Sequence, residues 1–167
     1  KLGKKIYITG KGRCNLTNTD QSLTHYRTSE PGFPAQVLER VGIQDTLNKF
    51  TEFGIFTKNR NGYLYPYSDQ AASVAVVLRL EAEHMGVKLA LNTEALGLTR
   101  TEKGFQVRTE GWSYPADAVI LTAGSKAAPE TGSDGSGYTL ARSLGHRIVR
   151  PLPALVQLRC KEKIFEK

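Results

Sequence analysis

The feature that most constrains the fold is a glycine turn directly behind an apolar segment near the start of the chain. Residues 6–9 are β-branched and aromatic, which predicts a short buried strand. Gly10 and Gly12 follow at once, and glycine allows a positive φ and a close approach of the backbone to a ligand. Three chemically distinct side chains come next, those of Arg13, Cys14 and Asn15.

Two interpretations of this turn stay open on chemistry alone. It could hold a phosphate or a planar heterocycle, or it could be a tight strand exit with Asn and Thr in ordinary turn positions. Gly10 and Gly12 begin like the dinucleotide-binding fingerprint, but Asn15 stands where the third glycine belongs. The Gly-Lys-Ser/Thr ending of a Walker loop is absent from this sequence.

The charge of the chain, formally +7, is concentrated near its two ends. Such a bias could indicate a phosphate-bearing partner, including nucleic acid. The basic residues are not interleaved with aromatic residues along the sequence, however, and no predicted helix carries a basic stripe. Solvated surfaces explain the charge at least as well, so the sequence disfavours nucleic acid as a partner.

Composition also limits the class of protein. The 167 residues suffice for one domain with a core, and no apolar run reaches the roughly 18 residues of a membrane span. No leader is visible, which favours a cytoplasmic protein with reduced thiols, although a disulfide between Cys14 and Cys160 stays open. The three histidines lack metal-ligand spacing, so we expect no metal site; they are His25, His84 and His146.

Periodicity predicts four helices, at residues 35–41, 45–53, 68–85 with Ser68 as N-cap, and 138–144. An Asn61-Gly62 turn predicts a hairpin of residues 55–57 and 63–65. A small antiparallel β-meander is expected at residues 95–99, 105–109 and 112–114.

Further strands are expected at residues 87–91, 118–121, 146–149 and 155–158, and the third predicted helix should form a right-handed crossover. Ligands gather at the carboxyl ends of strands in open α/β sheets. Both glycine turns, at residues 10–12 and 122–124, follow predicted strands and are therefore the candidate binding loops.

Five sequence segments together resemble one known family. Residues 4–18, KKIYITGKGRCNLTN, are similar to the GRCNxTN loop of the BaiN-like flavoproteins, two-domain FAD enzymes that include proteins named aminoacetone oxidases. Similar segments follow in the family's order: GYLYP at 62–66, AVILTAG at 118–124, TGSDGSGY at 131–138 and PALV at 153–156. Three positions depart from the family pattern: Lys11 and Ser125 replace glycines, and Tyr63 replaces an arginine.

The resemblance implies an α/β fold, namely a portion of a glutathione-reductase-like Rossmann FAD-binding domain with a small antiparallel β-meander. It implies FAD as cofactor and NAD(P)H as one candidate electron donor, and it identifies no catalytic residue. Ala95 would meet the adenine end through its backbone. The residues implied to contact the cofactor are Lys4, Gly10, Gly12, Arg13, Cys14, Asn15, Ala95, Thr122, Ala123 and Gly124.

The resemblance also implies how the chain is divided. Residues 1–150 would be a partial FAD-binding domain that lacks the N-terminal GxGxxG unit, and residues 151–167 would begin a second, substrate-side β domain. The chain would then be a fragment of a cytoplasmic FAD-dependent oxidoreductase that acts on a small organic substrate, inactive by itself. Its exposed sheet edges could pair in a homodimer.

The alternative is a non-enzymatic basic module that binds nucleic acid or another phosphate-rich partner. Flavin absorbance of the full-length protein would favour the enzyme. Salt-sensitive nucleic-acid binding without flavin would favour the module.

Overall fold

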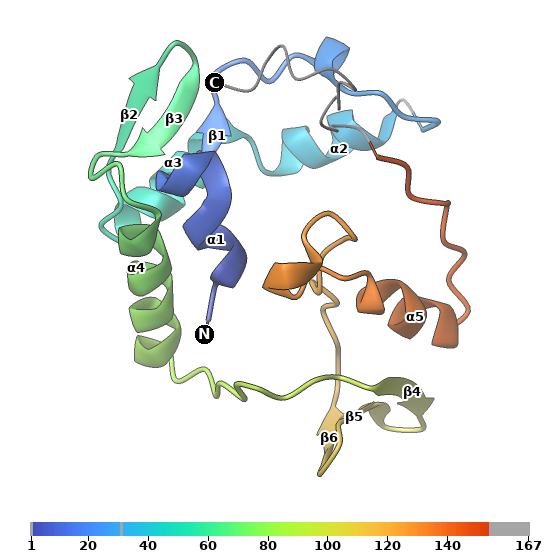
Figure 1. Ribbon diagram of the computed structural model, residues 1–167. Helices are drawn as coiled ribbons and strands as arrows, with labels where there is room; N and C mark the ends of the chain where they lie inside the picture. The colour runs from blue at the N-terminus through green and yellow to red at the C-terminus, as the bar shows by residue number, and fades with distance from the viewer. Residues whose placement is uncertain (1, 31, 154–167) are drawn as a thin grey trace, which may run out of the picture. The chain divides into compact units, whose positions relative to one another are not determined.

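The computed structural model describes residues 2–30 and 32–153 (Figure 1). The chain divides into two compact units, Lys1–Asn92 and Thr93–Lys167, and we describe each by itself.

The first unit combines six helical segments, four of them α-helices and two of them 3-10 helices, with a three-stranded antiparallel sheet. The sheet has the order β1-β3-β2, and the tight turn between β2 and β3 consists of Asn61 and Gly62, both at positive φ. Its elements are α1 (Lys4–Ile8), η1 (Thr9–Gly12), β1 (Thr17–Asn18), η2 (Leu23–His25), α2 (Gly32–Arg40), α3 (Ile43–Glu52), β2 (Thr57–Arg60), β3 (Tyr63–Pro66) and α4 (Ala71–His84).

The core of this unit lies along the inner face of α4. Ala71 and Val74 of α4 are buried there with Ile55 and Cys14. Partly buried apolar side chains surround this cluster, and one of them is Ile6 of α1, which packs along α4 (Figure 1). The segment with the glycine turn is thus fastened to the most apolar helix of the unit.

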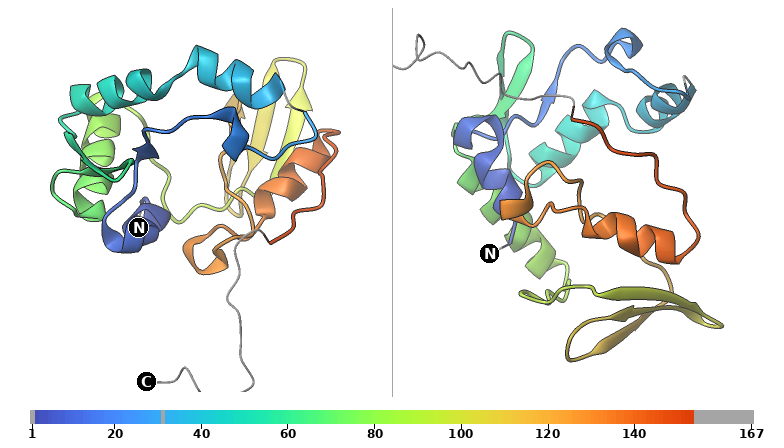
Figure 2. Two further views of the ribbon diagram at one scale, coloured as in Figure 1. Left: turned by 90° about the horizontal axis from the view of Figure 1, so that it is seen from above. Right: turned by 45° about the vertical axis from the view of Figure 1, so that its right-hand side comes forward.

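The second unit is a three-stranded antiparallel meander with one helix against it. The sheet has the order β4-β5-β6, and α5 contacts it at β4, where the Ser143 hydroxyl donates to the carbonyl of Leu98 over 2.9 Å (Figure 2). Its elements are β4 (Gly97–Thr101), β5 (Gly104–Arg108), β6 (Ser113–Ala116), η3 (Pro129–Thr131) and α5 (Ser136–Ser143).

The predicted elements whose hydrogen bonds are local are confirmed, although their first and last residues differ from the predicted ones. The four predicted helices are α2, α3, α4 and α5, and both the hairpin and the meander are present. Ser68 is not the N-cap of α4, because the helix begins three residues later, behind Gln70. Among the described residues, no helix is long and apolar enough to cross a bilayer.

Four predicted strands are wrong. Residues 6–9 form the end of α1 and the start of η1, and residues 87–91, 118–121 and 146–149 have no regular structure. The predicted crossover is absent with them. A strand requires a neighbouring strand to pair with its backbone N–H and C=O groups, and among the described residues none of these segments is paired in a sheet. Ile120, in the middle of the predicted strand at 118–121, is 87% exposed. The predicted strand at 155–158 lies outside the described residues.

The packing of α4 leads to a stability prediction. Val74 is 1% exposed, whereas Val76 on the same helix is 41% exposed. We expect Val74→Ala to lower the free energy of unfolding by about 1.5–3 kcal/mol, because it removes fully buried apolar surface. Val76→Ala, the matched control, should change it by less than about 0.5 kcal/mol. Urea denaturation of the full-length protein measures both, and equal losses would contradict this account of the core.

Candidate functional site

The glycine turn is an unusually tight reversal of the backbone. Four of its residues have left-handed φ values: Gly10 at 56°, Lys11 at 56°, Gly12 at 83° and Cys14 at 63°. The Cys14 N–H donates to the carbonyl of Thr9 over 3.0 Å, and the Arg13 N–H donates to the carbonyl of Gly10 over 3.3 Å. These two amides close the turn, so neither of them is free for a ligand.

The two glycines of the turn serve different purposes. A Cβ on Gly10 would lie 2.8 Å from the backbone nitrogen of Asn15 and 3.1 Å from the ring of Tyr65. A Cβ on Gly12 would meet nothing closer than the carbonyl oxygen of Tyr7, at 3.9 Å. Gly10 is therefore required by packing within the protein, and Gly12 leaves the backbone open to an approaching molecule.

Arg13 and Cys14 point to opposite environments. The Cys14 thiol is free and lies in the core beside Ile55 and Val74. The Arg13 guanidinium lies 5.1 Å from the centroid of the Tyr65 ring, and its Nε donates to the carbonyl of Gly10 over 3.2 Å. Its two terminal nitrogens bond no side chain in the part of the chain that the structure describes. Arg13 is thus held at one end and can offer a fork of donors at the other.

The fold joins two sequence motifs that are far apart along the chain. The turn continues into β1, which pairs with β3, so that Thr17 lies opposite Leu64 and Asn18 opposite Tyr63. The N–H of Leu16 donates to the carbonyl of Leu64 over 2.8 Å. The GRCNxTN-like loop and the GYLYP segment therefore form one continuous surface.

The second candidate loop is built by internal contacts in the second unit. Thr122, Ala123 and Gly124 are exposed, and a Cβ on Gly124 would lie 2.5 Å from the Ser133 hydroxyl. That hydroxyl donates to the carbonyl of Ser125 over 2.9 Å. The AVILTAG and TGSDGSGY segments are therefore in contact. Position 124 has no room for a side chain, because Ser133 lies against it.

A carboxylate stands at the start of α5, beside this loop. Asp134 accepts a hydrogen bond from the N–H of Ser136 over 2.9 Å. That backbone bond is the main cause that holds the pKa of Asp134 below its ordinary value. The Asp134 carboxylate thus accepts a hydrogen bond from one of the backbone N–H groups that are left unpaired at the start of α5.

For the remaining predicted site residues the structure shows only their exposure and the element in which they lie. Lys4 is exposed at the first position of α1, and Asn15 is exposed behind the turn. Ala95 is partly buried in the irregular segment before β4. The structure thus gathers Gly10, Gly12, Arg13, Cys14 and Asn15 in one unit and Ala95 with the second loop in the other. Among the described residues, no three His, Cys, Asp or Glu side chains lie close enough to hold a metal ion.

The sequence analysis did not predict a charged cluster that lies beside Arg13 of the glycine turn. Asp69 accepts hydrogen bonds from Lys58 and Arg60, each over 2.5 Å. The hairpin prediction contained the signal, because strand alternation across Asn61-Gly62 places these cations beside the tyrosines of the other strand.

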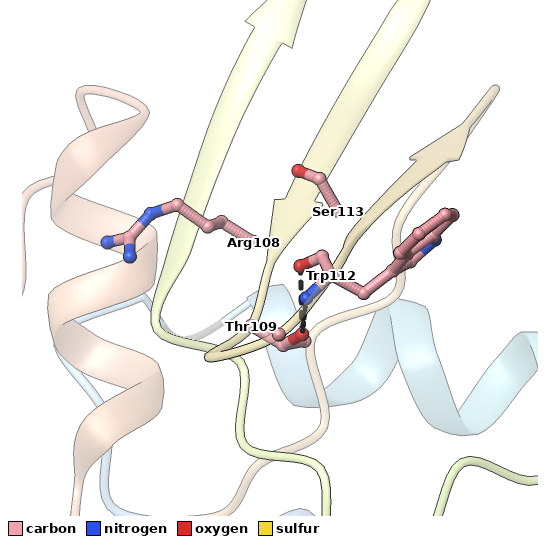
Figure 3. A pocket seen from close by; sticks show the side chains of 5 residues that line it. Arg108, Thr109, Trp112 and Ser113 are labelled. Carbon is pink, nitrogen blue, oxygen red and sulfur yellow. Dashed lines mark hydrogen bonds between the residues drawn. The ribbon is translucent and has the colours of Figure 1, made fainter.

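Two surface hollows were also candidates. One, of 470 Å³, lies at the turn between β5 and β6 (Figure 3). There the Thr109 hydroxyl bonds the backbone of Trp112, whereas the side chains of Arg108 and Trp112 point away from each other (Figure 3). Ligand-binding sites have several polar groups that converge on the ligand, and the polar side chains around this hollow do not converge.

The other hollow, of 340 Å³, lies in the first unit and is mostly apolar. Its walls come from η2, α2 and the start of α3, and its lining residues are Gln21, Leu23, Ala35, Leu38, Glu39, Gly42 and Ile43.

Glycine-rich loops that bind a ligand are a feature of open α/β domains. Residues 1–156 match the family described as HI0933-like protein Rossmann domain, and the chain belongs to this family. The match spans both loops and the meander. It confirms the predicted family and fold class.

Curated relatives extend the comparison. The chain is 48% identical, over 99% of its length, to the 3-dehydro-bile acid delta(4,6)-reductase of Clostridium scindens. It is 26% identical to the ribosomal RNA dihydrouridine synthases of Haemophilus influenzae, over 97% of the chain, and of Escherichia coli, over 99%. It spans 41% of the first two relatives and 42% of the third, about two fifths of their length.

The different surroundings of the two glycines lead to a prediction. Gly10→Ala and Gly12→Ala both place a side chain at a left-handed φ, which costs about 1–2 kcal/mol. Gly10→Ala also creates the clash with Asn15 and Tyr65, and overpacking of this kind adds about 1–3 kcal/mol. Thermal unfolding of the two variants should therefore show the larger loss for Gly10→Ala. A larger loss for Gly12→Ala would overturn the assigned roles.

Proposed function

We propose that the full-length protein containing this chain is an FAD-dependent reductase of a carbon–carbon double bond conjugated to a carbonyl group in a small organic molecule. The observation that carries this proposal is the 48% identity, across nearly the whole chain, to a protein named as a delta(4,6)-reductase. Because the chain spans about two fifths of that relative, the activity belongs to the whole protein.

The names of the relatives share one chemistry. A 3-dehydro-bile acid with delta(4,6) unsaturation carries double bonds conjugated to a ketone, and uridine carries a double bond conjugated to a ring carbonyl. Reduction of each such carbon–carbon double bond adds two electrons and two protons across it. When bound, a reduced flavin supplies the hydride for such a reaction.

The described residues fit a flavin dinucleotide at the first loop. Arg13 presents its donors beside the open backbone of Gly12, and the exposed Lys11 adds a second cation. These groups suit the phosphates or a ring carbonyl of the cofactor, because guanidinium bonds to oxyanions are charge-assisted. Cys14 anchors the turn from the core side and is a positioning residue. On the family resemblance alone we also retain, as proposed cofactor contacts, Lys4, Asn15, Ala95, Thr122, Ala123 and Gly124.

A nucleotide base within RNA is a second candidate substrate. Two relatives are named as ribosomal RNA dihydrouridine synthases, and the chain has a net charge of +7. The higher identity to the bile acid reductase favours the small molecule. The non-enzymatic basic module is not favoured, because all three relatives are named as enzymes.

We also propose NAD(P)H as electron donor, a cytoplasmic location, a homodimer and a domain boundary between residues 150 and 151.

The reaction can be tested by following flavin reoxidation. In the full-length protein, photoreduced without oxygen, we expect a 3-oxo-Δ4 steroid to reoxidise the flavin and to be reduced at the conjugated bond. The matched saturated 3-oxo steroid should leave the flavin reduced. Reoxidation by uridine-containing ribosomal RNA but not by the steroid would favour the second candidate, and reoxidation by neither would contradict a reductase of this class.

The role of Arg13 can be tested by flavin titration. We expect Arg13→Ala to weaken FAD binding by about 1–3 kcal/mol, because it removes charge-assisted hydrogen bonds. Arg100→Ala, which alters an exposed arginine of β4, is the control and should bind FAD like the wild type. If Arg13→Ala keeps wild-type affinity, Arg13 only stabilises the turn.

A further inference from the structure

The outer face of the β2–β3 hairpin alternates cations with aromatic rings. Antiparallel pairing sets Lys58 opposite Tyr65 and Arg60 opposite Tyr63, and residues directly opposite each other share one face of the sheet. The next residue of β3, Leu64, is 5% exposed and faces the core. Cations and aromatic residues that are not interleaved along the sequence are therefore brought together in this hairpin by strand pairing. We call Lys58, Arg60, Tyr63, Tyr65 and Tyr67 the hairpin face.

The hairpin face carries more positive charge than its one carboxylate neutralises. Asp69 bonds both Lys58 and Arg60, and Arg13 stacks against the ring of Tyr65. The Lys58 ammonium lies 5.5 Å from the centroid of the Tyr67 ring. Three cations thus converge on one acid, whose pKa is lowered mainly by the hydrogen bond from Lys58 and also by the charges of Arg60, Lys58 and Arg13. The cluster has a net charge of about +2, and an anion can balance it.

Asp69 combines two uncommon structural features. It has a φ of +54°, although it is not a glycine. Its Oδ1 is enclosed and has no hydrogen-bond partner among the described residues. Unfavourable local features of this kind concentrate at binding sites, where the surrounding structure maintains them. Here the other carboxylate oxygen, Oδ2, holds both cations of β2 through ion pairs.

Aromatic side chains remain available beside these cations. Tyr63 is 50% exposed and Tyr67 is 71% exposed, so a planar ring can stack on either. Phosphate binds arginine and lysine through charge-assisted bonds, and nucleobases stack on tyrosine. A nucleotide combines both groups in one molecule.

We propose that the hairpin face binds a nucleotide other than the flavin cofactor, with its phosphates at Lys58 and Arg60 and its base against Tyr63 or Tyr67. The diphosphate of a dinucleotide matches the surplus charge of the cluster. Tyr65 connects this face to Arg13, so the nucleotide would lie beside the loop proposed to hold the flavin. That position suits a pyridine dinucleotide that donates electrons. A nucleotide within RNA offers the same chemistry, and the test separates the two sources.

The test is calorimetric titration of the flavin-loaded full-length protein with ADP-ribose, which cannot react, and separately with short single-stranded RNA. We expect Lys58→Gln and Arg60→Gln each to weaken binding by roughly tenfold or more, since each removes a charge-assisted bond to phosphate. Lys88→Gln is the matched control, an exposed cation of the same unit away from the hairpin, and should bind like the wild type. Tyr63→Leu keeps every charge and should weaken binding through the base alone.

Flavin absorbance and circular dichroism of each variant complete the experiment. ADP-ribose binding that depends on Lys58 and Arg60, with flavin content unchanged, supports a dinucleotide. RNA binding with the same dependence supports the polymeric source. Absence of binding to both probes, or variants that bind like the wild type, overturns the proposal.

Two further outcomes separate this proposal from others. Loss of flavin from folded Lys58→Gln or Arg60→Gln overturns it also, since the face would then belong to the cofactor. If the wild-type protein holds no flavin, the proposed function fails, whereas the two titrations still decide the nucleotide site.

Discussion

The first unit depends on the burial of Cys14 at the end of a left-handed turn. The thiol lies in the core with Ile55, Ala71 and Val74, and this contact ties the turn to α4. Because Cys14 is fixed inward, the preceding Arg13 is directed to the ring of Tyr65. A buried thiol here acts as a small apolar anchor rather than as a reactive group.

The anchored turn places the GRCNxTN-like loop beside the GYLYP segment, so these two motifs of the family share one surface. β1 continues from the turn and pairs with β3, so the loop and the hairpin form one sheet. Arg13 of the turn and Lys58 and Arg60 of β2 thereby come to surround Asp69, although the turn, β2 and Asp69 are separate stretches of the chain. The proposed cofactor loop and the proposed nucleotide face are thus neighbours through Tyr65. In the second unit, the loop of residues 122–125 depends in a similar way on Ser133.

The sequence predicted the structures whose hydrogen bonds are local. The Asn61-Gly62 hairpin, the meander and the helices each close within a few residues, so propensity and turn chemistry suffice for them. Residues 6–9 and 118–121 were predicted as strands from composition, but a strand needs a distant neighbour that composition does not reveal. The glycine loops were found because their motifs are contiguous. The cluster around Asp69 was missed, because it forms only when the hairpin folds and Asp69 meets β2.

The most direct test of the central claim is the absorbance spectrum of the purified full-length protein. We predict flavin bands, a stoichiometry near one flavin per chain, and release of intact FAD on heat denaturation. The same measurement on Arg13→Ala should show a smaller bound fraction at equal protein concentration. A folded wild-type protein that remains colourless, even after incubation with excess FAD, would contradict the assignment of this chain to a flavin-dependent reductase.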